Sequence, residues 1–253
     1  MVNRNKKHIL HIVRLLFVFF IMNVVWYIAY LLISHPILPS PLAVYFSIGH
    51  LDGKSIWLHI CYSLFRICVG LLLALTIGLL IGLLMGRSRL WNKLLDPIVY
   101  LTYPIPKIAL LPVVMLFFGL GETSKILMIM LILLFQIIIS VRDGVKAIPD
   151  STYDVLTSIG ASRLQKFWHV TLPGALSVIL STIRISLGTA ISVLFFTEIY
   201  GTEHGMGYFI MDAWLRMDYT EMYAGIMLFS LIGFVLFMLV DYLDARFMKW
   251  RNS

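Results

Sequence analysis

The most constraining feature of this sequence is a series of apolar stretches, each close to the length that crosses a lipid bilayer. The hydrocarbon core of a bilayer requires about 20 apolar residues per helix. Because backbone polar groups find no partners in lipid, such stretches cross it as helices. The sequence therefore predicts an all-α polytopic membrane protein with about six transmembrane helices, over residues 11–33, 60–86, 97–120, 125–141, 174–199 and 222–243.

The composition supports this fold class. Hydrophobic residues make up 60% of the 253 residues and charged residues only 13%, whereas soluble domains carry about 25% charged residues. The net charge of +7 is explained by basic cytoplasmic flanks, so no nucleic-acid partner is expected. Cys61 and Cys68 have no metal-ligand spacing, so neither a metal site nor a disulfide framework is predicted.

The distribution of Lys and Arg predicts the orientation, because basic residues gather on the cytoplasmic side. With the N-terminus inside, that side receives Arg4, Lys6, Lys7, Arg14, Arg87, Arg89, Lys93, Arg142, Lys146, Arg163, Lys166, Arg246, Lys249 and Arg251. Lys54, Lys125 and Arg216 then face outward. We therefore expect a cytoplasmic N-terminus over 1–10 and a single transmembrane domain over 11–253 with a cytoplasmic C-terminus.

The same orientation places a loop over about 142–173 in the cytoplasm and a loop over about 200–221 outside. The first apolar run continues to Ile33, which is too long for a signal-peptide core, so it is interpreted as an uncleaved first span.

Residues 150–173 form the longest polar interruption of the chain. Pro149 can open a first helix, Gly160 suits a left-handed stop, and Ser162 can cap a second short helix. Pro173 fits the first turn of the next apolar helix, where its missing N–H is harmless. This pattern predicts a rigid two-helix element between two spans, and an ordinary capped loop is the alternative.

Small residues recur at every fourth position of the second span, at Gly70, Ala74, Gly78, Gly82 and Gly86. Such a ridge allows another helix to approach closely, which drives helix packing in lipid. We interpret these residues as a packing face. The general frequency of glycine in membrane helices is the alternative, and the sequence leaves open whether the packing is within or between subunits.

The third stretch is interrupted by Pro97, Pro104, Pro106 and Pro112 and contains Lys107. Interrupted helices often line the substrate route of transporters, so Lys107 is a candidate for a translocation pathway. Its alternative is to extend from near the cytoplasmic end of the span toward the membrane surface.

The fifth stretch contains Arg184 and Glu198. A structural ion pair or an interfacial position is favoured for both, and a place in a translocation pathway is the alternative. In the outer loop, residues 208–217 can form an amphipathic helix at the membrane interface. Its aromatic residues belong either to an interfacial belt or to a docking face for an external protein.

The chain lacks a credible nucleotide-binding loop. Gly53-Lys54-Ser55 resembles the end of a phosphate-binding loop, but Ile48 stands where the first glycine is required. No strand precedes this segment, and it lies on the outer side of the predicted topology. Any ATP must therefore be hydrolysed by a partner.

The polar element resembles the cytoplasmic loop of ABC importer permeases, which is written EAA-x3-G-x9-I-x-L-P. The matching positions are Asp154, Val155, Leu156, Gly160, Val170, Leu172 and Pro173. The motifs Leu38-Pro-Ser-Pro41, Gly86-Arg-Ser-Arg89, Leu95-Asp-Pro97, Pro104-Ile-Pro-Lys-Ile-Ala-Leu-Leu-Pro112, Phe118-Gly-Leu-Gly121 and Gly160-Ala-Ser-Arg163 are similar to those of the branch associated with nitrate, sulfonate, taurine and thiamine-precursor import. The departure is at the signature itself, where Asp154 replaces the usual Glu and Val155-Leu156 replace the paired alanines.

This resemblance implies a permease subunit of an ATP-driven importer in the cell (inner) membrane. The subunit has no catalysis or bound cofactor of its own. The implied partners are a second copy of the permease, membrane lipid, an external solute-binding protein, and two cytoplasmic ATPase subunits that carry ATP and Mg²⁺. The implied substrate is a small organic anion or a thiamine-precursor-like heterocycle, and Lys107 and Arg184 support an anion.

The resemblance also assigns roles in the cytoplasmic loop. They are Asp154 as the charged contact with the ATPase, Gly160 as the corner, Arg163, Leu164 and Phe167 as the docking face, and Pro173 as the end of the loop signature.

Two other classes of function compete with this interpretation. A self-sufficient secondary transporter or channel predicts inverted repeats and paired intramembrane charges, and no clear repeat relates residues 11–120 to 125–243. A membrane-embedded enzyme requires clustered His, Asp, Glu or Cys residues, but His59, His169 and His204 are scattered near loops. A non-catalytic importer subunit is therefore favoured.

Overall fold

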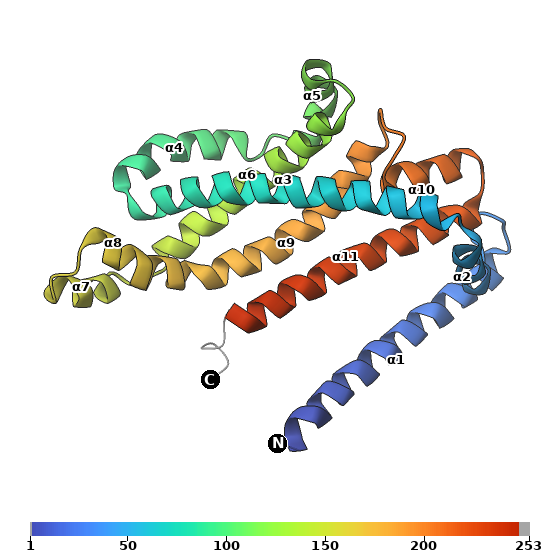
Figure 1. The fold of residues 1–253 in the computed structure, drawn as a ribbon, viewed down its shortest axis with the longest axis horizontal. Coiled ribbons are helices and arrows are strands. Elements are labelled where there is room, and N and C mark those ends of the chain that lie inside the picture. Colours follow the sequence, from blue (N-terminus) through green and yellow to red (C-terminus); the bar gives the residue numbers. More distant parts are fainter. Residues whose placement is uncertain (1, 248–253) are drawn as a thin grey trace. The chain divides into compact units, whose positions relative to one another are not determined.

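The computed structural model describes residues 2–247, and the regular secondary structure in this range is helical (Figure 1). The elements are α1 (Val2–Ile33), α2 (Pro41–His50), α3 (Gly53–Arg87), α4 (Arg89–Thr102), the 3-10 helix η1 (Lys107–Leu110), α5 (Leu111–Phe118), α6 (Glu122–Lys146), α7 (Asp150–Ser158), α8 (Arg163–Lys166), the π-helical turn η2 (Phe167–Thr171), α9 (Leu172–Glu198), α10 (Met206–Leu215) and α11 (Tyr219–Phe247). The all-α prediction is confirmed. Lys249 and Arg251 lie outside the described residues.

Five helical segments within residues 2–247 are long and apolar enough to cross a membrane. The third predicted span, 97–120, is interrupted, as its prolines indicated. It is a bent pair, α4 and the segment Lys107–Phe118, whose axes differ by 80°. Pro104 and Pro106 lack the N–H groups that would continue the helix. The Lys107 ammonium instead donates to the carbonyls of Thr102 (3.0 Å) and Tyr103 (2.9 Å), which end α4.

The chain divides into two compact units, one containing residues up to Ile56 together with Phe209–Leu228, and the other containing Trp57–Tyr208 and the residues from Phe229 onward. In the first unit, Ser40 caps α2 by accepting a hydrogen bond from the Ala43 N–H, and Pro41 occupies the first turn. The Trp26 indole donates to the Pro39 carbonyl at 3.1 Å, which fixes the connection between α1 and α2.

The second unit is built on close packing of α3 against α6. An added Cβ atom would approach the branched side chains of α6 to 2.7 Å at Gly70 (Ile129), 2.7 Å at Gly78 (Ile137), 2.8 Å at Gly82 (Val141) and 2.6 Å at Gly86 (Val145). Ala74, between them, is fully buried. The small-residue ridge of α3 therefore contacts a helix of the same chain, and the missing side chains allow the two backbones to approach.

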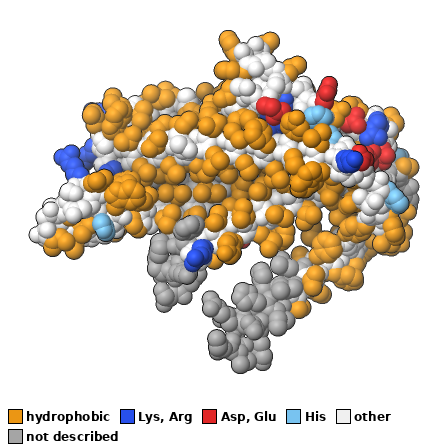
Figure 2. Space-filling view, in the orientation of Figure 1, with side chains coloured by type: hydrophobic (Ala, Val, Ile, Leu, Met, Phe, Trp, Pro, Cys, Tyr) orange, Lys and Arg blue, Asp and Glu red, His pale blue; other side chains and the backbone are white. Residues whose placement is uncertain are grey.

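Helix α6 also packs closely on α9. An added Cβ at Gly144 would lie 2.9 Å from Val178, and one at Gly174 would lie 2.8 Å from the Ile148 side chain. Helices α3, α6 and α9 thus form the packed centre of the second unit. Hydrophobic side chains cover most of the face shown in Figure 2, as expected of a surface in contact with lipid.

Candidate functional site

The polar interruption folds into a two-helix element, defined here as residues 150–173 and called the coupling element. Helix α7 ends at Ser158, and Gly160 follows two residues later with a φ of +76°. The Gly160 N–H donates to the Thr157 carbonyl at 3.0 Å, and the Ala161 N–H donates to the Leu156 carbonyl at 2.9 Å. These two bonds form a Schellman motif, which satisfies the last carbonyls of α7 and reverses the chain over one left-handed residue.

Helix α8 starts at a capping box. The Ser162 hydroxyl accepts a hydrogen bond from the Gln165 N–H at 3.3 Å, and the Gln165 side chain accepts one from the Ser162 N–H at 2.7 Å. The two reciprocal bonds satisfy donors that the first turn of a helix otherwise leaves free. Two local motifs therefore fix the corner between α7 and α8.

The second helix of the coupling element runs into the following span without a break. The segment Arg163–Glu198 is one span-length helical segment of 36 residues. We expected Pro173 to open a new helix; it lies in the first turn of α9, but the helical backbone already begins at Arg163. The Leu172 N–H donates five residues back, to the Phe167 carbonyl. This π-helical turn accommodates the proline ring, which would otherwise clash with the carbonyl four residues before it.

Helix α7 is held in place through its single buried side chain, Tyr153. The Tyr153 hydroxyl lies 3.1 Å from the Thr171 hydroxyl of η2. The Arg87 guanidinium at the end of α3 lies 3.8 Å from the centre of the Tyr153 ring. The coupling element is thus fixed to η2 and to the end of α3 through Tyr153.

The coupling element exposes four large apolar side chains. Its exposed large side chains are Val155, Ile159, Leu164 and Trp168, with 56–74% of each residue accessible. Of the residues with predicted roles, Asp154, Gly160, Arg163, Leu164 and Pro173 are exposed and Phe167 is half-buried. Sequence reasoning missed Ile159 and Trp168 as surface candidates; the available signal was that both are large apolar residues in the longest polar segment of the sequence.

A second assembly, the ion cluster, consists of Arg66, Glu122, Lys125 and Glu198. Two nitrogens of the Arg66 guanidinium donate to the two Glu122 oxygens at 2.6 Å each, and a third donates to Glu198 at 2.6 Å. The side chains of Arg66 and Glu198 are fully buried, whereas that of Glu122 is 39% exposed. The Lys125 ammonium donates to the carbonyls of Leu120 (2.6 Å) and Gly201 (3.2 Å).

Glu198 of the ion cluster and two polar residues of α3 bind the backbone at the start of α10. The Gly205 N–H donates to His59 Nδ1 at 3.0 Å, the Met206 N–H to the Ser63 hydroxyl at 2.8 Å, and the Gly207 N–H to Glu198 at 2.8 Å. The first N–H groups of α10, which lack partners within the helix, are thus satisfied by side chains of α3 and α9. The Glu198 carboxylate also lies at the positive end of the helix dipole.

Sequence reasoning selected Glu198 but missed Arg66, the one charged residue within residues 60–86. An ionisable residue in a transmembrane stretch marks a functional or paired position, so this arginine was the available signal.

Sequence similarity to known proteins identifies the family of the chain. The sequence profile described as "Binding-protein-dependent transport system inner membrane component" matches residues 74–249. The taurine transport system permease protein TauC of Escherichia coli (strain K12) is 36% identical over 241 residues, covering 92% of this chain and 87% of TauC. The chain belongs to this permease family. The putative aliphatic sulfonates transport permease protein SsuC of Bacillus subtilis (strain 168) is 33% identical, covering 87% of the permease and 80% of SsuC.

Solved structures share the fold. Inward-facing MetNI methionine ABC transporter has a chain that superposes with a TM-score of 0.64 at 19% identity, covering 79% of the permease and 98% of that chain. A chain of a bacterial alginate ABC transporter, solved in complex with an alginate pentasaccharide-bound periplasmic protein, gives a TM-score of 0.66 at 16% identity. The match covers 92% of the permease and 94% of that chain. The permease is therefore a membrane-spanning transport subunit of an ABC importer, and its ATPase is a separate subunit.

The remaining candidates for a translocation pathway have different partners in the permease. The Lys107 ammonium, in addition to capping α4, lies 4.7 Å from the centre of the Phe135 ring. Arg184 forms an ion pair with Asp241 of α11, and both side chains are about half exposed. Lys107, Arg184 and Glu198 therefore belong to three separate sets of interactions.

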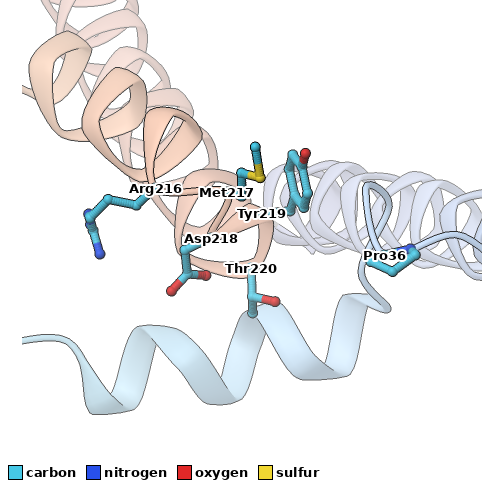
Figure 3. Close-up of a pocket in the computed structure, with 6 residues that line it drawn as sticks. All are labelled: Pro36, Arg216, Met217, Asp218, Tyr219 and Thr220. Atoms are coloured by element: carbon cyan, nitrogen blue, oxygen red, sulfur yellow. The ribbon is translucent and has the colours of Figure 1, made fainter.

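The first unit carries a small pocket at the turn between α10 and α11. Figure 3 shows the six residues that line it, Pro36 and the consecutive residues Arg216–Thr220. Arg216 pairs with Asp212 at 3.0 Å and with Glu221 at 2.8 Å. The hydrogen bond to Glu221 raises the pKa of Arg216 above its ordinary value, so this guanidinium stays charged at all physiological pH values.

Proposed function

We propose that the permease imports a small sulfonate-type organic anion and that the coupling element is its contact with the ATPase. The substrate class is supported by similarity to proteins named for taurine and aliphatic sulfonates transport. A formylaminopyrimidine transport permease from Halalkalibacterium halodurans is 29% identical over 93% of the chain, which makes a thiamine-precursor-like heterocycle the second candidate.

The observation that carries the coupling role is the continuity of α8 with α9. A partner that grips the exposed apolar side chains Val155, Ile159, Leu164 and Trp168 holds a rigid corner. Because the backbone from Arg163 to Glu198 is helical throughout, a tilt of this corner moves the attached span. ATP binding then shifts the balance between inward- and outward-facing states through its different affinity for each.

We place the coupling element and both termini in the cytoplasm on the asymmetry of Lys and Arg. We further propose a homodimer of permeases with two ATPase subunits, in which Mg-ATP is bound by the ATPases. A binding protein delivers substrate on the opposite side of the membrane. The turn at Arg216–Thr220, which carries both charges and an exposed Met217, is its candidate contact.

The coupling role is tested by Gly160→Val, with Gly119→Val as the matched control. Both glycines have a positive φ, +76° at Gly160 and +78° at Gly119, and an added Cβ meets no atom within 4 Å at either position. The ψ of 179° at Gly119 lies in a region that is essentially restricted to glycine. Valine is strained by about 1–3 kcal/mol at both positions, and more at Gly119, so a greater loss of ATPase binding in Gly160→Val cannot come from backbone strain alone. We expect Gly160→Val to lower the fraction of permease that co-elutes with the ATPase, whereas Gly119→Val retains it. Equal co-elution of the two variants would contradict the coupling role.

Transport itself is tested in vesicles that contain the permease, its ATPase and the binding protein encoded beside them. Uptake is expected to require ATP, and uptake that persists without ATP would show a self-sufficient transporter instead. Thermal shift of the binding protein with taurine, an alkanesulfonate, nitrate and formylaminopyrimidine identifies the substrate class. Stabilisation by formylaminopyrimidine alone would replace the anion by the heterocycle.

A further inference from the structure

The two assemblies described above lie at opposite ends of one helical segment. This helical segment begins at Arg163, within the coupling element, and ends at Glu198, within the ion cluster. At 1.5 Å per residue, the 36 residues between these ends extend over about 54 Å. A displacement applied at Arg163 therefore arrives at the ion cluster through continuous helix.

Glu198 is both the end of α9 and a partner of the next helix. One of its carboxylate oxygens accepts a hydrogen bond from the Arg66 guanidinium at 2.6 Å, and the other accepts one from the Gly207 N–H of α10 at 2.8 Å. The Ser63 hydroxyl donates to the same carboxylate at 2.8 Å. Charge-assisted hydrogen bonds in a buried site are stronger than neutral ones, so the end of α9 is firmly attached to the start of α10.

The start of α10 and the last turn of α9 are in close backbone contact. An added Cβ at Gly207 would lie 2.8 Å from the Glu198 Cβ and 2.8 Å from the Phe195 carbonyl oxygen. An added Cβ at Gly205, whose φ is +130°, would lie 2.4 Å from the Glu198 carboxyl carbon. Glycine allows this close approach at both positions, because the backbone at the start of α10 lies directly against the last turn of α9.

We infer that Glu198 is a positioning residue for transport, which transmits movement of α9 from the coupling element to the first turn of α10. This inference rests on the proposed role of the coupling element. It assigns to the ion cluster a task beyond stability, because a buried carboxylate could neutralise Arg66 without contacting α10. The other carboxylate on Arg66, that of Glu122, shows this arrangement, since it belongs to α6 and pairs with Arg66 through both oxygens.

Glu122→Gln is therefore the matched control for Glu198→Gln. Each substitution removes one negative charge from Arg66 and keeps a side chain of the same size. Only Glu198→Gln weakens the attachment to Gly207. Gly207→Ala is a second test variant, because its added methyl group separates α10 from α9 and leaves every charge in place.

The experiment measures amide hydrogen exchange in the permease–ATPase complex in lipid nanodiscs, with and without Mg-ATP and vanadate. In the wild type we expect nucleotide to change the exchange rates at 150–170 and at 205–208. Glu198→Gln and Gly207→Ala should lose the nucleotide-dependent change at 205–208 and retain it at 150–170. Glu122→Gln should retain both. If the Glu198→Gln permease fails to form the complex with the ATPase, Gly207→Ala is compared with Glu122→Gln instead.

Three results would overturn the inference. The first is a nucleotide-dependent change at 205–208 that survives in the test variants. The second is an equal loss in Glu122→Gln, which would give the ion cluster a structural role alone. The third is a wild-type response at 150–170 with none at 205–208, which leaves the proposed function intact. Absence of a response at both segments would overturn the proposed function and the inference together.

Discussion

The packing of α3 on α6 makes a quantitative prediction for Gly78→Ala. The added methyl carbon would lie 2.7 Å from Ile137 Cγ2 and 3.0 Å from Ile137 Cβ. Because Ile137 is branched at Cβ, its side chain cannot rotate out of the way without meeting another neighbour. The two helices must separate locally, and such overpacking typically costs about 1–3 kcal/mol.

The matched control is Gly188→Ala in α9, where an added Cβ meets only the Phe237 ring edge at 3.5 Å, an ordinary contact. Both substitutions gain about 1 kcal/mol from the better helix propensity of alanine, so the difference between the two variants is the overpacking alone. For a chain of this size, 1 kcal/mol corresponds to about 2–4 °C in Tm. We expect Gly78→Ala to melt about 2–12 °C below Gly188→Ala in detergent.

A double variant identifies the clashing side chain. In an Ile137→Ala background, Gly78→Ala should lose part of its destabilising effect, because Ile137 Cγ2, the nearest atom that it meets, is gone while the Cβ atom remains. The measurement is the thermal melting of all four combinations, followed by intrinsic fluorescence. A Tm for Gly78→Ala at or above that of Gly188→Ala would refute close packing of α3 on α6 at this position. An undiminished effect in the Ile137→Ala background would refute the named contact.

Three further substitutions test other parts of the structure. Ser162→Ala removes the cap of α8, worth about 1 kcal/mol, and should reduce co-elution with the ATPase while the Tm of the isolated permease changes by less than about 4 °C. Arg66→Met leaves Glu198 buried without its cation, at a cost of about 3–5 kcal/mol, and should abolish the monodisperse peak in size-exclusion chromatography. Lys107→Met removes the donors that end α4, worth about 1 kcal/mol, and should lower the Tm by about 2–4 °C.

Local features of the coupling element could be predicted because their causes lie within a few residues. The left-handed Gly160 and the capping box of Ser162 both involve partners no more than five positions away. The continuity of α8 with α9 could not be predicted in the same way. A proline at this position is compatible with a new helix, and the π-helical turn that accommodates Pro173 has no distinct sequence signature.

The third predicted span shows a different limit. Its prolines indicated an interruption, but hydropathy alone does not distinguish a kinked span from two short helices. The 80° bend depends on where the last carbonyls of α4 find donors. Lys107 supplies them from beyond the break. The role of a side chain that caps a preceding helix can be suspected from the sequence but is established only by geometry.

The ion cluster was missed because its members are far apart in the chain. Arg66 is 56 residues from Glu122 and 132 residues from Glu198. Pairing each charge of the apolar stretches with an opposite charge would nevertheless have indicated the ion cluster. A lone arginine in an apolar stretch requires a carboxylate at the same depth, and Glu122 and Glu198 begin and end apolar helices. The two buried cations, Arg66 and Lys125, are matched in number by these two carboxylates.

The two ends of the segment Arg163–Glu198 therefore differ in what they leave unsatisfied. At Glu198 the carboxylate, the guanidinium and the first N–H groups of α10 are all paired within the chain. At the coupling element the Schellman motif and the capping box pair the backbone groups of the corner, but apolar side chains such as Ile159 and Trp168 remain exposed. An apolar surface on a polar element is stabilised by a partner, whereas a closed ion cluster has no need of one. We therefore expect the ATPase subunit to bind at the coupling element. We expect the resulting movement of α9 to reach the start of α10 through Glu198.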